Sequence, residues 1–286
     1  MRFGINTMAW GDGLGPADVA RFPWIRDLGY DGVELPILVP ESIDTGLIRD
    51  ALTRAGLRCM ASTALPAGAS LLEDDQREAG LAFLRDTLAI AGAIGAEVLC
   101  GPLFAPVGLH RHPPTDVERD RFVGAVRERA PDAARHGVRL AIEPLNRFET
   151  GFLNTIDDGR RLVERIGHSS VGLLADTFHM NIEERDVPAA LRRALPALAH
   201  VHFSANDRGT VGTGHLPWRR IAATLTDGGY DGWVVFETFA GHIPQLAQAT
   251  AIWRPLAESP ERYAIDSLRA AAPWFALETP EGDPVP

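Results

Sequence analysis

Lysine is absent from this chain of 286 residues, so all 28 of its basic residues are arginines. A lysine Schiff base and the phosphate-binding lysine of Walker-type loops are therefore excluded. Cysteine is scarce as well: Cys59 and Cys100 are the two present, and both lie in apolar stretches typical of strands. We expect both to be buried and inert thiols, because this pattern fits neither a disulfide framework nor a zinc knuckle.

The chain also lacks long hydrophobic runs and an excess of positive charge. No window approaches the roughly 18 to 20 apolar residues of a membrane-spanning helix, and the N-terminus does not read as a signal peptide. Acidic residues outnumber basic ones by 38 to 28, which gives a formal net charge of −10. That sign opposes binding to nucleic acid and suits small neutral substrates or metal cations. We therefore expect a cytoplasmic protein with no nucleic-acid partner and no membrane partner.

Short apolar runs alternate with longer segments of helical periodicity, which is the pattern of parallel β/α architecture. Eight runs are predicted as strands: Phe3–Thr7, Gly32–Glu34, Leu57–Ser62, Glu97–Gly101, Arg139–Glu143, Val171–Asp176, Ala199–Phe203 and Gly232–Glu237. Eight is the strand number of a TIM barrel, which uses about 250 residues as one domain. A dinucleotide-binding open sheet is disfavoured, because Gly11, Gly13 and Gly15 have the wrong spacing for its fingerprint. The sequence thus predicts an α/β fold, a single (β/α)8 TIM barrel domain over residues 1–286.

Helices are predicted between these strands over Ser42–Ala55, Arg77–Ile94, Thr115–His136 and Thr155–Ile166. Each is followed by a glycine just before the next strand, as is common at helix C-termini. The phrase Gly-Tyr-Asp-Gly occurs at 29–32 and again at 229–232, which suits a repeated β/α unit. The stretch after Gln245 is predicted to form a short C-terminal helical extension and a proline-ended tail.

Metal-ligand side chains close the last four predicted strands. They are Glu143, Asp176, His202 and Glu237. In a TIM barrel the C-terminal strand ends carry the chemistry, so these side chains are expected to meet at one mouth. Three carboxylates and one imidazole suit Mn²⁺, Mg²⁺ or Co²⁺. Four protein ligands leave two positions of an octahedron for adjacent oxygens of a substrate.

Glu34 and the other histidines are weaker candidates for the functional site. Glu34 closes the second predicted strand and is a candidate to support the ligands from behind. His200 lies on the same face of its strand as His202, and we expect a hydrogen-bonded interior residue and not a fifth ligand. The remaining histidines lie in loops or near helix ends and are assigned to the solvated surface: His110, His112, His136, His168, His215 and His242.

Five segments form a more specific pattern. They are Glu-Pro-Leu-Asn-Arg-Phe-Glu at 143–149, Asp-Thr-Phe-His-Met-Asn-Ile-Glu-Glu at 176–184, His-Val-His at 200–202 followed by Asn-Asp-Arg-Gly at 206–209, Gly-Thr-Gly-His at 212–215, and Phe-Glu-Thr at 236–238. In order and spacing they resemble the D-tagatose/D-allulose (psicose) 3-epimerase family, a group of sugar isomerase barrels of the xylose-isomerase type. The resemblance is dense from about Arg139 to Glu237 and looser before it.

The resemblance implies a divalent-metal isomerase that epimerises a free ketose at C3. By motif position it implies the metal ligands Glu143, Asp176, His202 and Glu237, with Glu143 and Glu237 also acting as the acid/base pair. It places Glu149, His179 and Arg208 at substrate oxygens near C1 to C3. Mn²⁺ is the expected metal, with Mg²⁺ or Co²⁺ as alternatives, and a homodimer or homotetramer is the expected assembly. Some members have a tryptophan wall after the fourth strand, where this chain has Gly-Pro-Leu-Phe-Ala-Pro-Val-Gly at 101–108.

The same chemistry follows from the residue types. Loss of the proton next to a ketone leaves an enediolate, and a metal that chelates the two adjacent oxygens stabilises its charge. Inversion needs the proton to leave on one face and return on the other. Glu143 and Glu237, from the fifth and eighth strands, are placed to flank the sugar. The candidate pairs are D-allulose/D-fructose, D-tagatose/D-sorbose and L-ribulose/L-xylulose.

Three alternatives stay open at this point. An aldose–ketose isomerase of the hydroxypyruvate or inosose type would use the same metal and enediolate, and its product would differ in carbonyl position. A metal-dependent endonuclease-type hydrolase would need more histidine ligands and a basic face, neither of which this acidic chain plainly offers. A non-catalytic sugar- or metal-binding relative is the third, although all four ligand residues are present.

Overall fold

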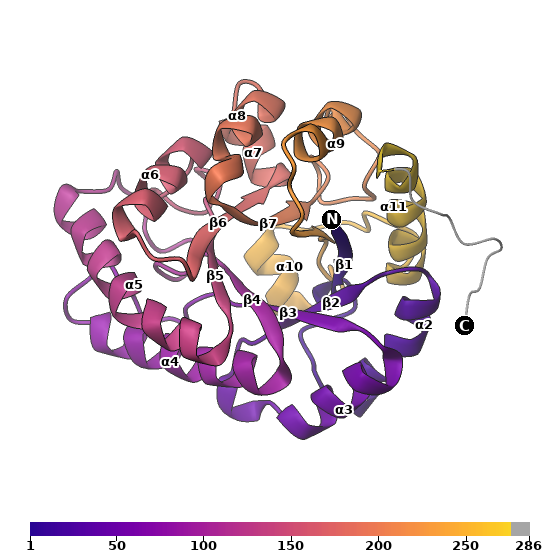
Figure 1. The fold of residues 1–286 in the computed structure, drawn as a ribbon, viewed down its shortest axis with the longest axis horizontal. Coiled ribbons are helices and arrows are strands. Elements are labelled where there is room, and N and C mark those ends of the chain that lie inside the picture. The colour runs from indigo at the N-terminus through magenta and orange to yellow at the C-terminus, as the bar shows by residue number, and fades with distance from the viewer. Residues whose placement is uncertain (276–286) are drawn as a thin grey trace.

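The computed structural model describes residues 1–275 and contains a closed barrel of eight parallel strands. Each strand pairs with its neighbours in the sequence, and β8 closes the barrel against β1 (Figure 1). The strands are β1 (Arg2–Asn6), β2 (Gly32–Pro36), β3 (Arg58–Ser62), β4 (Ala96–Gly101), β5 (Arg139–Ile142), β6 (Val171–Asp176), β7 (Leu198–Phe203) and β8 (Trp233–Phe236). All eight predicted strands are present within two residues of their expected bounds. The prediction of a TIM barrel is therefore confirmed.

The described helices surround the barrel, except for α10, which lies over its centre in the view of Figure 1. They are α1 (Pro16–Val19), α2 (Phe22–Asp27), α3 (Thr45–Ala55), α4 (Arg77–Ile94), α5 (Asp116–His136), α6 (Ile156–Ile166), α7 (Thr177–Glu183), α8 (Val187–Ala194), α9 (Trp218–Asp227), α10 (Pro244–Thr250) and α11 (Pro260–Phe275). Short 3₁₀ helices cover Thr7–Ala9, Pro40–Ser42 and Leu195–Ala197. The predicted tail lies outside the described residues, so the statement that residues 1–286 form one domain stays a prediction.

The helix boundaries follow from local capping. The helix predicted from Ser42 begins at Thr45, because the carboxylate of Asp44 accepts a hydrogen bond from the Leu47 backbone N–H at 2.9 Å. Four helices end as expected at glycines in the left-handed conformation: Gly56, Gly95, Gly137 and Gly167. Positive φ angles favour glycine at these positions, because it has no Cβ to clash with the backbone.

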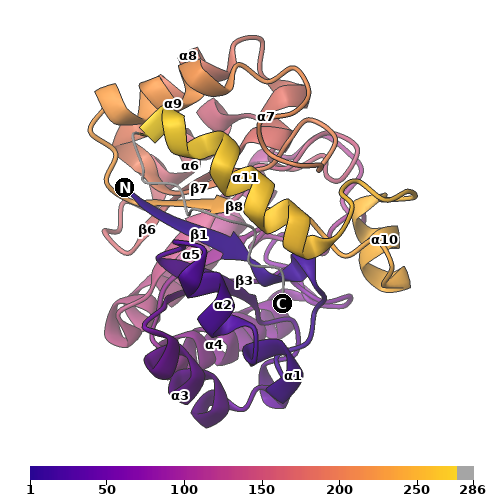
Figure 2. The same cartoon turned by 90° about the vertical axis from the view of Figure 1, so that its right-hand side faces the viewer.

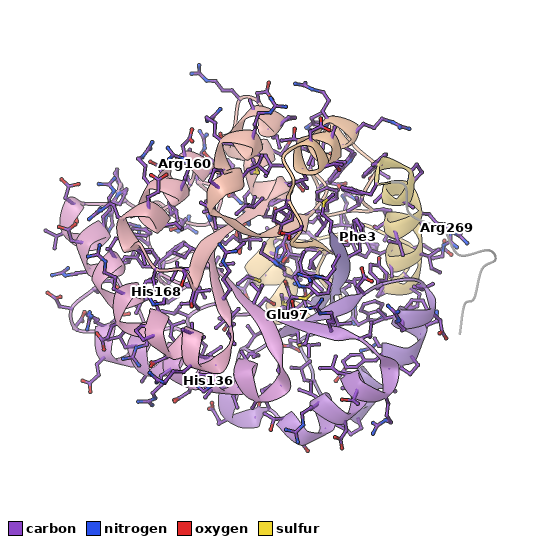
Figure 3. The ribbon with its side chains drawn as sticks, viewed as in Figure 1. Phe3, Glu97, His136, Arg160, His168 and Arg269 are labelled. Atoms are coloured by element: carbon purple, nitrogen blue, oxygen red, sulfur yellow. The ribbon has the colours of Figure 1, made fainter. Side chains whose placement is uncertain are left out.

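The N-terminal end of the barrel is closed by Trp233. Its indole is 1% exposed and donates a hydrogen bond from Nε1 to Glu97, 3.1 Å away. The guanidinium groups of Arg2 and Arg58 lie over the indole ring at 4.9 and 5.7 Å from its centroid. Figure 3 shows Glu97 near the barrel axis, whereas His136 lies among the surrounding helices. Further apolar side chains, including that of Leu174, pack around Trp233 inside the barrel. The N-terminal end of the barrel is therefore filled by side chains, which leaves the C-terminal mouth as the end where a ligand can bind.

Two helices follow the last strand, as the sequence predicts. Helix α10 lies beyond the C-terminal strand ends, and Figure 2 shows it projecting from that end of the barrel. Helix α11 packs beside α9 on the outside, and the hydroxyl of Tyr30 donates to the Ala264 carbonyl at 2.8 Å. In the described part of the chain, no helix is both long enough and apolar enough to span a membrane.

Candidate active site

The four side chains predicted to bind a metal lie together at the C-terminal mouth of the barrel. Asp176 is the last residue of β6, and His202 is the fifth of the six residues of β7. Glu143 and Glu237 directly follow the last residues of β5 and β8. All four residues are 6% exposed or less. Parallel strands of a closed barrel thus bring residues that are far apart in the sequence to one place.

The carboxylates converge on one nitrogen of His202. Its Nδ1 atom lies 3.1 Å from Oε1 of Glu237 and 3.6 Å from Oδ2 of Asp176. Ligand atoms of Glu143, Asp176 and His202 all lie within 4.8 Å of one another. This is the size of cluster that can hold a metal ion.

The chemistry of this cluster fits a divalent cation. Nδ1 of His202 is buried, and despite the short approaches it makes no hydrogen bond to the described residues. Burial acts to lower the pKa of His202, but the negative charges of Glu237 and Glu34 outweigh burial and raise it well above its ordinary value. Three buried carboxylates around an imidazole therefore attract positive charge, and this donor set suits a hard to borderline ion.

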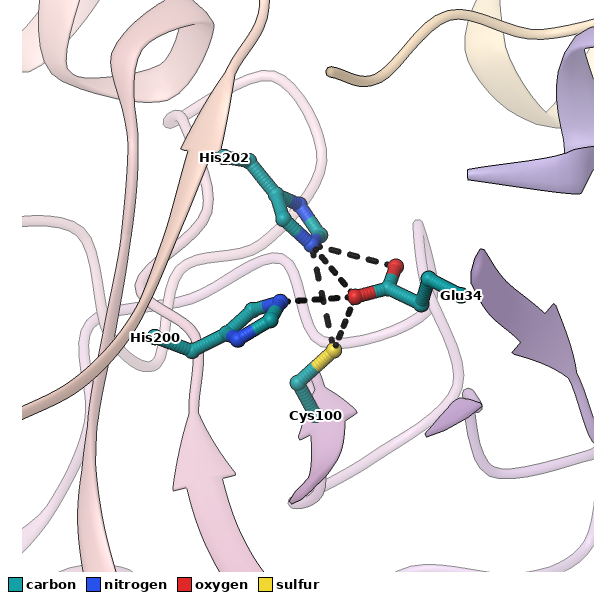
Figure 4. Close-up of side chains that lie close together, drawn as sticks. All are labelled: Glu34, Cys100, His200 and His202. Atoms are coloured by element: carbon teal, nitrogen blue, oxygen red, sulfur yellow. Dashed lines mark hydrogen bonds and ion pairs between the residues drawn. The ribbon is translucent and has the colours of Figure 1, made fainter. Parts of the chain in front are cut away.

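The other nitrogen of His202 faces Glu34 (Figure 4). Nε2 of His202 is 3.1 Å from the Glu34 carboxylate, and Nε2 of His200 is 2.7 Å from it. The thiol of Cys100 donates to the same carboxylate, with a distance of 3.3 Å. An ionised carboxylate only accepts hydrogen bonds, so Nε2 of His202 carries a proton, and Nδ1 is the nitrogen that can exchange its proton for a metal. Glu34 thereby sets the tautomer that a metal-binding imidazole requires.

The surroundings of Glu34 complete this network. Asn6 donates from Nδ2 to Glu34 at 2.8 Å and to Oε1 of Glu237 at 3.3 Å. Burial acts to raise the pKa of Glu34, but His202 and His200 outweigh it and hold the pKa well below its ordinary value. Glu34 lies in the middle of β2 and not at its end, because the strand continues to Pro36. His200 is a hydrogen-bonded interior residue, as predicted, and both cysteines are buried and free.

The two carboxylate oxygens of Asp176 have different partners: one caps a helix, and the other faces the metal-ligand cluster. Its Oδ1 accepts hydrogen bonds from the backbone N–H groups of Phe178 at 2.6 Å and His179 at 3.1 Å, which caps α7. Its Oδ2 faces His202 and lies 3.4 Å from Nη1 of Arg208. The cap fixes the rotation of the carboxylate, so one oxygen is always presented to the mouth of the barrel.

Glu143 and Glu237 have opposite pKa shifts. Burial raises the pKa of Glu143 well above its ordinary value, and the nearby carboxylate of Glu237 adds to this effect. Burial also acts to raise the pKa of Glu237, but the charges of His202 and Arg208 outweigh it and lower the pKa to about 2. Both carboxylates line the same cavity, from strands that are not neighbours in the barrel.

His179 is held as a hydrogen-bond donor toward the cavity. The backbone N–H of Asn146 donates to its Nδ1 atom at 3.0 Å, so the proton of the neutral ring lies on Nε2. Burial lowers the pKa of His179 to about 3, which leaves the ring neutral near neutral pH. Its Nε2 atom lies 3.2 Å from Nη2 of Arg208 and 3.6 Å from Oε1 of Glu143. The side chain of Asn146 also donates to Glu149 at 2.8 Å and links two of the predicted substrate-binding residues.

Arg208 occupies an unusual backbone conformation beside the carboxylates. Its φ angle is 64°, a left-handed value that costs a long side chain about 1 kcal/mol or more. Its Nη1 atom donates to Oε2 of Glu237 at 2.6 Å, and its guanidinium lies over the ring of Phe178. The hydroxyl of Thr238 donates to the Arg208 carbonyl at 2.6 Å. Neighbouring groups therefore hold the strained backbone and aim the guanidinium at Glu237.

The cavity above these residues has two kinds of wall. It has a volume of about 180 Å³, and the charged residues and histidines of its lining are Glu143, Glu149, His179, His202, Arg208 and Glu237. The rest of the wall is largely apolar and includes Met8, Leu38, Val107, Leu145 and Leu246. Leu246 belongs to α10, so this helix forms part of the roof. All seven side chains predicted for the site lie in or beside this cavity, with Asp176 beneath its floor.

Sequence reasoning missed some contributors and misplaced one histidine. Asn6, Asn146 and Thr238 orient the site, and their common amide and hydroxyl side chains gave no distinguishing signal. His110 was expected on the surface, but it is 3% exposed. It is buried because its ring packs against Phe152 and its Nε2 atom contacts Glu118 at 3.1 Å.

Comparison with known proteins agrees with this geometry. The model of a family described as "Xylose isomerase-like TIM barrel" matches residues 22–275. The chain belongs to this family. An L-ribulose 3-epimerase from Mesorhizobium japonicum is 34% identical over 260 residues, which cover 89% of this chain and 88% of that protein. A probable ketose 3-epimerase from Synechocystis is 33% identical and covers 94% of this chain and 95% of the relative.

Solved structures of the family point to the same group. The D-allulose 3-epimerase from Methylomonas, crystallised with D-allulose, superposes with a TM-score of 0.89 at 29% identity, over 94% of this chain and 95% of that one. Within the xylose isomerase-like barrels the chain therefore lies among the ketose 3-epimerases. The predicted resemblance is confirmed, and with it the prediction of an enzyme of the isomerase class.

Proposed function

We propose that this enzyme epimerises free ketoses at C3 and depends on a divalent metal held by Glu143, Asp176, His202 and Glu237. One observation carries the proposal: three buried carboxylates and Nδ1 of His202, whose other nitrogen is held by Glu34, meet at the floor of a cavity. The similarity to ketose 3-epimerases supports the reaction type. A bound divalent cation supplies a Lewis acid that stabilises negative charge on two adjacent substrate oxygens.

Proton transfer falls to the two glutamates. Glu143 and Glu237 come from β5 and β8 and both line the cavity, so they are available to opposite faces of a sugar between them. One removes the proton from C3 as a base, and the other returns a proton to the opposite face as an acid. The reaction then inverts the stereocentre and leaves the carbonyl in place.

The remaining predicted residues bind the oxygens around the reacting carbon. His179 presents an N–H to the cavity because Asn146 occupies its other nitrogen. Arg208 presents a guanidinium next to Glu237, and Glu149 accepts hydrogen bonds from sugar hydroxyls. Together they fix the reacting end of the sugar, so the carbon to be inverted is held between the glutamates.

The composition of the cavity wall favours a free sugar over a sugar phosphate. Arg208 is the one arginine among the described residues that line it, and this arginine is engaged by Asp176 and Glu237. A phosphate would find no second arginine or lysine side chain in this lining. The apolar side chains of the wall suit contact with the carbon atoms of a sugar.

The test removes the metal with EDTA, restores Mn²⁺, Mg²⁺ or Co²⁺, and follows a panel of ketohexoses and ketopentoses in D₂O by proton NMR. The panel contains D-allulose, D-fructose, D-tagatose, D-sorbose, L-ribulose and L-xylulose. Deuterium uptake at C3 with a C3-epimeric product, seen after metal is restored, is the expected result. Exchange at C1 with an aldose product would replace the proposal with aldose–ketose isomerisation. Mn²⁺ is the metal that we propose first, and a cytoplasmic homodimer or homotetramer is the proposed state.

A further inference from the structure

A second group of metal-ligand side chains lies in a different part of the chain from the site at the barrel mouth. His110 and His112 belong to the loop between β4 and α5, and Glu118 lies in the first turn of α5. One ligand atom from each of these residues lies within 4.8 Å of the others. We propose that these three residues form a zinc site that fastens the β4–α5 loop to α5.

The distances suit a four-coordinate ion. Oε1 of Glu118 is 3.1 Å from Nε2 of His110 and 3.7 Å from Nε2 of His112. Two ligands at tetrahedral zinc are roughly 3.3 Å apart when each bond is about 2.0 to 2.1 Å long. The two contacts bracket that separation, so small side-chain adjustments place both nitrogens around one ion. The ring centroids of the two histidines are 4.0 Å apart.

The position of the proton on His112 favours a cation between its ring and Glu118. Its Nδ1 atom lies 3.1 Å from the carbonyl oxygen of Pro113, which can only accept a hydrogen bond. In the neutral ring the proton therefore lies on Nδ1, and Nε2 carries a lone pair. That lone pair faces Oε1 of Glu118, which also only accepts. A positive ion between the two atoms converts this unfavourable contact into coordination.

Glu118 is already oriented for coordination. Its other oxygen, Oε2, accepts hydrogen bonds from the backbone N–H of Thr115 at 2.6 Å and from the Thr115 hydroxyl at 2.8 Å. This capping box leaves Oε1 directed at the two histidines. Hydrogen bonds that hold the second atom of each ligand are typical around bound metals, and both Glu118 and His112 have them.

The donor set and the exposure indicate the class of ion. Two imidazoles and one carboxylate suit Zn²⁺ better than Mg²⁺ or Ca²⁺, which prefer oxygen ligands. His110 and Glu118 are buried, whereas the side chain of His112 is 57% exposed. The fourth coordination position is therefore left to water on the solvent side, and the ion enters from there.

The site is connected to the active-site wall. The backbone N–H of Gly108 donates to the Glu149 carbonyl at 2.7 Å, and that of Gly151 donates to the His110 carbonyl at 2.7 Å. Val107, in the same loop, lines the cavity. An ion on these three ligands thus joins the N-terminus of α5 to the segment that carries Glu149. We expect zinc to stabilise this part of the fold.

The test compares zinc stoichiometry in the wild type, H112A and H136A. The full-length chain is stripped with EDTA, equilibrated with ZnCl₂ at pH 8, where free imidazole is neutral, and desalted before the zinc is counted. H112A removes an exposed ligand and leaves the buried contact of His110 with Glu118 in place. His136 is the matched control, because it is exposed and lies 18 positions beyond Glu118 in the same helix, roughly 27 Å away.

We expect H112A to bind one zinc ion fewer per chain than the wild type and H136A to bind as many as the wild type. Zinc bound at the barrel mouth would be counted equally in all three proteins. The difference in stoichiometry between the wild type and H112A therefore does not depend on whether that site is filled. Zinc should also raise the melting temperature of the wild type and H136A more than that of H112A. Equal stoichiometry in the wild type and H112A would overturn the proposal, as would an equal loss in H136A.

Discussion

The Glu34 carboxylate lies 3.1 Å from Nε2 of His202, on the side of the imidazole opposite to Asp176 and Glu237. This contact keeps a proton on Nε2 and leaves Nδ1 as the nitrogen that binds a metal. In E34Q the amide can present its NH₂ group to the same nitrogen and favour the other tautomer. We expect Mn²⁺ affinity to fall about 10- to 100-fold, as is typical when such a partner is lost.

Calorimetric titration of the EDTA-stripped protein with Mn²⁺ measures this effect. The control is E97Q, which changes a glutamate at the closed end of the same barrel and should leave Mn²⁺ affinity unchanged. Wild-type affinity in E34Q would show that Glu34 does not orient His202.

The two glutamates of the cavity are expected to be individually essential. E143Q and E237Q keep the size of each side chain and remove its ability to transfer a proton. Each variant should lose at least about a thousandfold in kcat, because general acid–base catalysis and a metal ligand are lost together. The rate of C3 deuterium exchange at saturating Mn²⁺ measures this loss. Near-normal turnover in either variant would contradict the two-carboxylate scheme.

Thr238 is expected to act through Arg208. T238V removes the hydroxyl that donates to the Arg208 carbonyl and holds its left-handed backbone, whereas T238S keeps that hydroxyl. One such hydrogen bond contributes about 1 kcal/mol, so we expect KM to rise about fivefold in T238V. R208A should raise KM further. Steady-state kinetics of all three variants tests the assignment, and equal KM values in T238V and T238S would refute it.

Metal binding at the barrel mouth is expected to stabilise the fold. An ion bound at a hundred times its dissociation constant adds about 2.7 kcal/mol to the free energy of unfolding. Differential scanning calorimetry in Mn²⁺ and in EDTA measures the shift in melting temperature. D176N is the informative variant, because asparagine also caps helices and so preserves the start of α7. The shift should be much smaller in D176N, and an undiminished shift would place the stabilising ion elsewhere.

The ion pair between Asp157 of α6 and Arg193 of α8 gives a pH-dependent prediction. The hydrogen bonds from Arg193, whose nearest nitrogen lies 2.8 Å away, hold the pKa of Asp157 below its ordinary value. The contribution to stability is therefore complete above a pH of about 4 and is lost as the pH falls through the lowered pKa.

R193Q should cost roughly 0.2 to 1 kcal/mol at pH 7, because the pair is partly exposed. The difference from the wild type should shrink in acid and at high salt. Urea unfolding at pH 7 and pH 3.5 measures it, with R192Q, at the neighbouring exposed position, as the control. A difference that grows in acid would reverse the sign of the proposed linkage.

The parts of the molecule that repeat were predictable from the sequence. Eight apolar runs and the glycines that end the helices gave the barrel, since each signal is local and recurs with every β/α unit. Glu143, Asp176, His202 and Glu237 could be grouped because parallel topology places all strand ends on one side. The prediction that Glu34 ends its strand was wrong, because the strand continues to Pro36. All five residues of this strand are buried, so no change from apolar to polar residues marks its end.

The contacts between distant loops could not be predicted. The burial of His110 depends on Phe152 and Glu118, which come from two other segments of the chain. Asn146 orients His179 through a backbone N–H, a group that every residue except proline carries. No residue type marks such a donor, so only the path of the loop reveals it.

The closure of the N-terminal end by Trp233 has a consequence for substrate entry and product release. With the N-terminal end filled by the indole and its arginine neighbours, substrate and product both reach the described cavity from the C-terminal mouth, where α10 forms part of the wall. In either direction of the reaction, the product must leave the cavity before the next sugar can bind. Substrate and product therefore pass the same side chains, Leu246 of α10 among them, in the forward and reverse conversions.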